Sequence, residues 1–113
     1  MKTNKSVPFH VRQGDVFIKR VDKVPSDAKP IKRINGRVIL AYGEVTGHHH
    51  SLTEEHVSLH ETASEVGVTY LEVKDAMAQL AHQEHSTIDI PPGVYRVTIQ
   101  REYTPAGLVN VRD

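Results

Sequence analysis

Turn signals divide this chain into short segments, and their spacing limits the fold more than any other feature of the sequence. Asn35-Gly36 is the dipeptide preferred in tight hairpin turns, and Pro91-Pro92-Gly93 precedes the longest apolar alternation. The segments between such signals are rich in β-branched residues and recur at intervals of about ten residues. No βαβ pattern and no long internal repeat is present. We therefore predict an all-β fold, a small single-domain barrel or sandwich of about eight short, mostly antiparallel strands.

Alternation of apolar and polar residues assigns faces to the clearest segments. Val57 and Leu59 should face the core, and Tyr95, Val97 and Ile99 should share one face of the longest segment. Residues 1–12, which include a proline at position 8, are expected to form a flexible N-terminal arm before a barrel-like domain over 13–113. Residues 74–82 are expected to form a turn followed by a strand. The other expected strands are residues 15–21, 31–34, 37–42, 56–60, 66–73, 87–90, 94–103 and 108–111.

Composition excludes several classes of protein. Cysteine is absent, so disulfides and thiolate metal sites are excluded, and any metal must have nitrogen or oxygen ligands. No apolar run approaches the roughly 18 residues of a membrane span, and the first residues lack the apolar stretch of a secretory signal. We expect a soluble cytoplasmic protein with no membrane partner.

The charges balance overall but are unevenly placed. Residues 1–40 hold ten of the 14 Lys and Arg but three of the 14 Asp and Glu. This asymmetry could mark a basic surface for nucleic acid or phosphate, or it could be neutralised between neighbouring strands, which is the interpretation we favour. Neutral net charge, few aromatics and no recognised motif make nucleic acid an unlikely partner.

The most chemically loaded stretch is Gly43-Glu44-Val45-Thr46-Gly47-His48-His49-His50-Ser51-Leu52, in a chain with eight histidines. It lies in mid-chain, so it belongs to the fold and is not a purification tag. In an extended conformation His48 and His50 share one face and His49 lies on the other. Two imidazoles on one face make half of a metal site.

A second group, His82-Gln83-Glu84-His85, can bring its histidines together in a turn. We predict that His48, His50, His82 and His85 bind a divalent metal ion, either zinc, iron or manganese. His60 and Glu54 are further candidate ligands. The alternative is a set of solvated polar loops that are rich in histidine by chance.

Four other residues are candidates for chemistry. Glu84 could be a ligand, orient a histidine or act as a general base, and Glu102 could be the acid or base. Arg101 could bind an anionic substrate and Tyr103 could donate a proton. For Asp15, a role in the turn before a strand is favoured over a functional one. The alternative for Arg101 and Tyr103 is a cross-strand ion pair and an ordinary tyrosine at the rim.

Part of the histidine run resembles the cupin motif. His48, His50 and Glu54 fit H-x-H-x(3)-E, but no histidine follows Pro91-Pro92-Gly93 where that motif requires one. The resemblance implies a β-barrel metal site by analogy and not cupin membership.

A longer resemblance covers about 90 residues of the chain. The blocks Arg12-Gln13-Gly14-Asp15-Val16, Gly43 to His50, His82 to His85, Pro92 to Val97 and Gln100 to Tyr103 are similar to those of a family of small uncharacterised bacterial and phage-type proteins. This resemblance indicates which residues matter and implies no activity.

These features support two classes of function. The first is a metal-binding β-barrel protein; if it is an enzyme, we expect a metal-dependent hydrolase that acts on a small or anionic substrate through metal-activated water. The second is a non-catalytic binding module of phage or mobile-element type, with a protein as its partner. A protein of either class could form a homo-oligomer.

Overall fold

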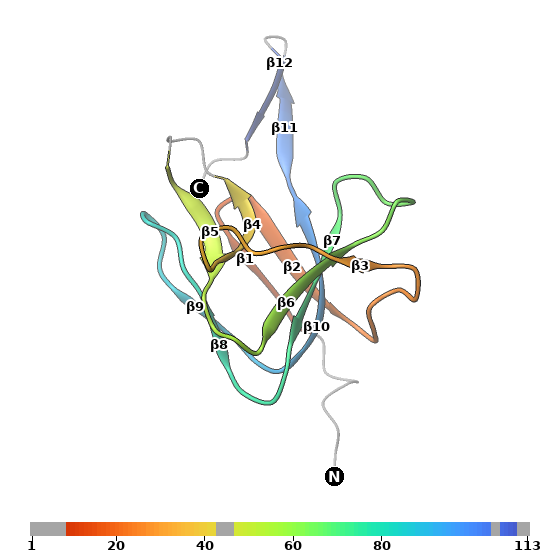
Figure 1. The fold of residues 1–113 in the computed structure, drawn as a ribbon. Helices are drawn as coiled ribbons and strands as arrows, with labels where there is room; N and C mark the ends of the chain where they lie inside the picture. Colours follow the sequence, from red (N-terminus) through yellow and green to blue (C-terminus); the bar gives the residue numbers. More distant parts are fainter. Residues whose placement is uncertain (1–8, 43–46, 105–106, 111–113) are drawn as a thin grey trace.

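The computed structural model describes residues 9–42, 47–104 and 107–110, with side chains described up to residue 100. Short strands dominate the fold (Figure 1). Within the described residues no helix has the length and apolar character to cross a membrane. The strands are β1 (His10–Gln13), β2 (Val16–Val21), β3 (Lys29–Pro30), β4 (Val38–Tyr42), β5 (His49–Leu52), β6 (Val57–Glu61), β7 (Thr69–Val73), β8 (Ala78–Leu80), β9 (Ile88–Ile90), β10 (Gly93–Ile99), β11 (Arg101–Thr104) and β12 (Gly107–Asn110).

The largest sheet has six strands in the order β1-β2-β10-β7-β6-β3, and neighbouring strands are antiparallel. β1 and β2 are joined by the two-residue turn Gly14-Asp15, with Gln13 opposite Val16. Gly14 has a φ of 59°, as the first central position of a type II′ hairpin turn requires. This turn holds Gln13 on the same inward face as Val16, since paired residues share a face.

A second layer is built from two strand pairs, β4-β5 and β8-β9. A bridge between Ser51 and Ala81 joins them: Ser51 N donates to Ala81 O at 3.0 Å, and Ala81 N donates to Ser51 O at 2.9 Å. The β4-β5 pairing is irregular between Ile39 and Ala41. The bridge is what brings the histidine run beside the segment that follows β8.

The core lies between these two layers. Side chains from β2, β10, β7 and β6 meet side chains from β4, β5, β8 and β9, and each fully buried aliphatic residue contributes about 1.5–3 kcal/mol. The predicted inward faces of Val57 and Leu59, and of Tyr95 and Val97, are confirmed by their burial. The core residues are Val16, Ile18, Val38, Leu40, Leu52, Val57, Leu59, Leu71, Val73, Ala78, Leu80, Ile90, Tyr95 and Val97.

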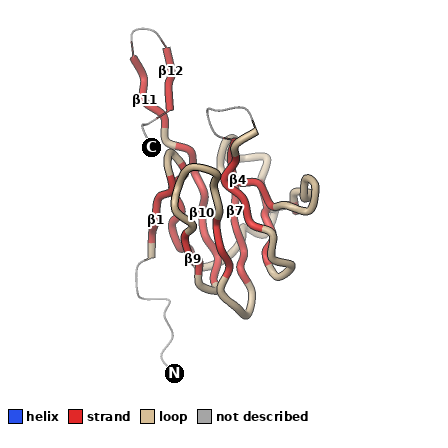
Figure 2. Tube along the Cα trace, turned by 90° about the vertical axis from the view of Figure 1, so that its left-hand side faces the viewer, coloured by secondary structure: helices blue, strands red, loops and turns tan. Residues whose placement is uncertain are grey.

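The prediction of an all-β fold with short antiparallel strands is confirmed. The sheets do not close into a barrel, because β1 and β3 are the two edges of the six-stranded sheet. Of the two architectures considered, the layered one is therefore present, and the domain expected over 13–113 is not barrel-like. Within the part of the chain that the structure describes, the remaining pair, β11 and β12, forms a hairpin that projects from the layers (Figure 2).

Several expected boundaries differ from the structure. The strand expected over 94–103 is divided at Gln100 into β10 and β11. Residues 10–12, which we assigned to the N-terminal arm, belong to β1 because they pair with β2; residues 1–8 lie outside the described part. Residues 31–34 form only a bridge between Ile34 and Arg37, closed by the predicted Asn35-Gly36 turn with φ values of 52° and 78°. β7 starts at Thr69 and not at residue 66, because Gly67 with a φ of 83° turns the chain.

Candidate functional site

The four histidines predicted as metal ligands come from two segments of the second layer. His48 and His50 lie at the start of β5, and His82 and His85 lie in the connection between β8 and β9. The Ser51–Ala81 bridge fixes these segments side by side. We refer to His48, His50, His82 and His85 as the histidine cluster.

The rings of the histidine cluster are close to one another. The centroid of the His82 ring lies 4.3 Å from that of His50, 4.6 Å from that of His85 and 5.8 Å from that of His48. The centroids of His50 and His85 are 6.0 Å apart. His49 points away, as alternation predicts: its ring meets the Tyr42 ring, and its Nδ1 lies 2.9 Å from Ser51 Oγ. The sequence prediction of two faces along this run therefore agrees with the structure.

Gln13 orients the buried ring of His50. Its side-chain Nε2 donates to Leu80 O at 3.0 Å and to Ser86 O at 2.9 Å, which fixes the orientation of the amide. The amide oxygen then lies 2.8 Å from His50 Nδ1, and since that oxygen only accepts, Nδ1 carries a proton. A neutral His50 therefore has its lone pair on Nε2, the nitrogen that faces Asp15.

Asp15 adds a buried carboxylate to the site. Its Oδ1 lies 3.7 Å from His50 Nε2, beyond hydrogen-bond distance, and its side chain is almost fully buried. The β1-β2 turn positions Asp15 here, and its carbonyl accepts a hydrogen bond from Gln100 N at 2.8 Å. The Asp15 side chain therefore places carboxyl oxygens beside the histidine that Gln13 orients.

Glu84 contacts two members of the histidine cluster in different ways. Its Oε2 lies 3.5 Å from His48 Nδ1, an ion-pair contact without a hydrogen bond. Its backbone N–H donates to His82 Nδ1 at 3.0 Å. A neutral His82 therefore carries its proton on Nε2, the opposite arrangement to that of His50.

The spacing of the rings can be compared with that of a metal site. With metal–nitrogen bonds of about 2.0–2.1 Å, two imidazoles on one tetrahedral ion have centroids about 5 Å apart. The four centroid distances given above, from 4.3 to 6.0 Å, lie on both sides of that value. Among the described residues, however, no group of three or more His, Asp or Glu side chains is arranged to hold a metal ion as it stands.

The other candidate residues lie away from the histidine cluster or outside the described side chains. His60 is on the outer face of the six-stranded sheet, where its Nε2 lies 3.0 Å from Ser58 Oγ and 3.8 Å from Glu72 Oε1. Glu54 accepts a hydrogen bond from Gln79 N at 2.9 Å. The backbone of Arg101, Glu102 and Tyr103 lies in β11, and their side chains are outside the described part.

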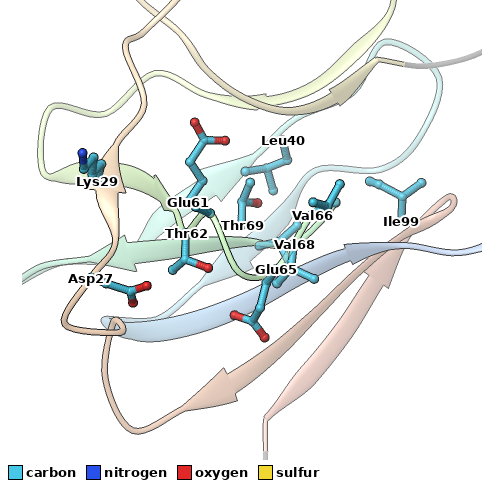
Figure 3. Close-up of a pocket in the computed structure, with 13 residues that line it drawn as sticks. Asp27, Lys29, Leu40, Glu61, Thr62, Glu65, Val66, Val68, Thr69 and Ile99 are labelled. Atoms are coloured by element: carbon cyan, nitrogen blue, oxygen red, sulfur yellow. The ribbon is translucent and has the colours of Figure 1, made fainter.

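Two of the cavities on the described surface differ in size and in their relation to the histidine cluster. The larger, about 770 Å³, lies between β4, β10 and the loop from Thr62 to Val68, with aliphatic walls that include Leu40 and Val97 (Figure 3). It contains no histidine. The smaller, about 210 Å³, adjoins the histidine cluster and shares His82 with it. We place the candidate site beside the smaller one, because His82 of the histidine cluster is part of its lining.

Sequence reasoning missed Gln13 and Arg37. Gly14-Asp15 is a two-residue hairpin signal, and recognising it would have paired Gln13 with Val16 and turned Gln13 inward. Arg37 carries no local signal, because its relation to the site depends on the pairing of β4 with β5.

The fold and the site define a small, two-layered antiparallel β-protein with a partly buried cluster of histidines beside a buried glutamine and aspartate. The chain belongs to the family described as Domain of unknown function (DUF8820), whose model matches residues 12–100. The match includes the histidine cluster, Gln13 and Asp15, and it agrees with the predicted membership of an uncharacterised family. No curated protein and no solved structure matches the chain.

Proposed function

We propose that the histidine cluster binds a divalent transition-metal ion. The observation that carries the proposal is the convergence of three imidazoles, from two segments about 30 residues apart, around the ring of His82, with the His50 ring oriented by Gln13. Zinc, iron and manganese all accept imidazole ligands, and a chain without cysteine offers no thiolate to compete.

The contacts that orient the rings suggest which histidines bind the ion directly and which one binds only after a rearrangement. His50 Nδ1 is hydrogen-bonded to Gln13 Oε1, so His50 can offer Nε2 to the ion. Glu84, whose Oε2 lies 3.5 Å from His48 Nδ1, would orient His48 in the same way in the metal-bound protein. We include His85 as the third ligand. His82 can ligate through Nε2 only after its bond with Glu84 N–H is given up, so its ligation requires the 82–85 connection to move.

If the site is catalytic, hydrolysis is the chemistry that it would support. Three histidine ligands leave a position for water, and the metal lowers the pKa of that water. Glu84, with its exposed carboxylate beside His48, would then be the general base for attack on an ester, phosphoester or amide.

The test is metal analysis of the protein purified without a nickel column. We expect stoichiometric zinc, iron or manganese in the wild type, and its loss in the His48→Ala, His50→Ala double variant. The matched control is His49→Ala, which removes the neighbouring imidazole that faces Tyr42 and should keep its metal. A folded wild-type protein that binds none of these ions would reject the proposal and leave the non-catalytic binding module as the better account.

A further inference from the structure

We propose that the smaller cavity binds the anionic group of a substrate, a phosphate or a carboxylate, through Arg37, His49 and Gln83. The role of this group as part of a substrate rests on the proposed metal site; the binding of the anion does not. The cavity is lined by Arg37, His49, Ser51, Ala81, His82 and Gln83.

The charge and hydrogen-bond donors of the cavity favour an anion. Its lining contains a guanidinium and no carboxylate, and a guanidinium presents donors in a fork that matches two oxygens of a phosphate or carboxylate. Arg37 Nη1 donates to Ser51 Oγ at 3.4 Å, a long contact that engages one of its five N–H groups. The remaining donors of Arg37 are available to a ligand.

The surrounding contacts turn two more donors toward a ligand. Because Ser51 Oγ accepts from Arg37, its hydroxyl proton can be donated to His49 Nδ1, 2.9 Å away. A neutral His49 then carries its own proton on Nε2. Gln83 Oε1 accepts from His49 N at 2.9 Å, which leaves the amide Nε2 of Gln83 as a donor.

The size and position of the smaller cavity indicate what kind of ligand carries the anionic group. About 210 Å³ is below the roughly 300–1,000 Å³ of sites that enclose a whole small molecule, so this cavity fits one group of a larger ligand. His82 lines the cavity and also contacts His50 and His85, so the bound group lies next to the histidine cluster. The rest of the ligand would extend toward the proposed metal.

The larger cavity does not compete for an anion. Its lining includes the carboxylates of Asp27, Glu61 and Glu65 against the single ammonium of Lys29 (Figure 3). The excess of negative charge in this lining repels an anion.

The experiment is a titration of the purified protein with inorganic phosphate and, separately, with acetate, followed by the NMR shifts of backbone amides. We expect saturable shifts at Arg37, His49 and Gln83, and about tenfold weaker binding in Arg37→Gln. Lys32→Gln is the matched control, because it removes the same charge from an exposed side chain outside the cavity and should keep affinity within about twofold. Binding of phosphate alone, or of acetate alone, assigns the anion type.

Two results would overturn the inference: no saturable shift with either anion, or equal losses in Arg37→Gln and Lys32→Gln. The variant His85→Ala separates this inference from the metal proposal. If phosphate binding survives Arg37→Gln but disappears in His85→Ala, the anion binds a metal and the Arg37 site is wrong. If it survives His85→Ala and weakens in Arg37→Gln while the wild type contains no metal, the metal proposal fails and the anion site stands.

Discussion

At the scale of single residues, Gln13 has the largest effect on how the site is built. One buried side chain satisfies Leu80 O, Ser86 O and His50 Nδ1, and so ties β1 to β8, to the segment before β9 and to the histidine cluster. Each buried polar group that is left without a partner costs about 1–3 kcal/mol. The amide is needed because a carboxylate cannot donate to the two carbonyls.

Replacing Gln13 should therefore damage both stability and the site. We expect Gln13→Leu to lower the free energy of unfolding by about 3 kcal/mol, measured by urea denaturation. The control Gln79→Leu changes a glutamine on the exposed side of β8, bonded to Asp89, and should cost less than about 0.5 kcal/mol. Equal costs in the two variants would mean that the buried bonds of Gln13 contribute little.

Two buried tyrosines should make stability depend on alkaline pH. The hydrogen bond to the Glu65 carboxylate, followed by burial, raises the pKa of Tyr70, and burial raises the pKa of Tyr95 although the Arg20 guanidinium opposes it. The unfolded chain loses these protons near pH 10 and the folded protein loses them at higher pH. The stabilisation is thus complete below about pH 10 and is lost as the pH rises through the raised pKa values of the two tyrosines in the folded protein.

The measurement is urea denaturation at about pH 8 and about pH 11. The double variant Tyr70→Phe, Tyr95→Phe should lose less stability between these pH values than the wild type. Tyr42→Phe, which changes an exposed tyrosine, is the control. A double variant with the same pH dependence as the wild type would contradict the assignment.

At the scale of elements, the turn into β10 depends on close packing at Gly93. A Cβ there would lie 2.7 Å from Arg20 Nη1 and 3.2 Å from the Tyr95 hydroxyl, and the φ of Gly93 is 155°. The Arg20 guanidinium contacts the rings of both Phe9 and Tyr95, 5.8 and 5.3 Å from their centroids, and its Nη2 donates to the Tyr95 hydroxyl at 3.2 Å, so moving it would give up these contacts. Tyr95 is fully buried and also donates to Pro91 O.

Gly93→Ala should therefore cost more than an alanine in an open turn. We expect a loss of about 3 kcal/mol in the free energy of unfolding for Gly93→Ala, and about 1 kcal/mol for Gly36→Ala, which has a φ of 78° and open space around it. Urea denaturation of both variants provides the comparison. A larger loss at Gly36 would show that the contact with Arg20 is unimportant.

The elements also show how far the sequence could predict this structure. Alternation predicted the buried faces of β6 and β10, and Asn35-Gly36 predicted a tight turn, because both signals are local. β1 was missed because Pro8 and the lack of a clear period suggested an arm, whereas its strand conformation comes from pairing with β2. Local propensity does not contain that information.

The histidines of the candidate site could be picked out from the sequence, but their arrangement in space could not. The spacing of His48 and His50 gave their shared face, and a turn at 82–85 allowed its two histidines to converge. Which two segments meet is decided by the bridge between Ser51 and Ala81, and no local pattern predicts a contact over that distance. Ligation by these histidines remains a prediction, as do the roles of Glu84, Arg101, Glu102 and Tyr103.

At the scale of the whole molecule, most of the apolar core comes from strands that carry no member of the histidine cluster. Apart from Leu52 of β5, the core side chains lie on β2, β4, β6, β7, β8, β9 and β10. We therefore expect the protein without metal to keep its two layers, and metal binding to add stability without creating the fold. His50 lies at the boundary, fully buried yet bonded to Gln13.

X-ray absorption at the metal edge of zinc-loaded protein tests the central claim most directly. For the wild type we predict a shell of nitrogen or oxygen at about 2.0–2.1 Å with outer-shell scattering from at least three imidazoles. His49→Ala should give the same spectrum, and His85→Ala should lose the scattering of one ring. A spectrum without imidazole scattering, or equal losses in His49→Ala and His85→Ala, would contradict the claim that the histidine cluster holds the ion.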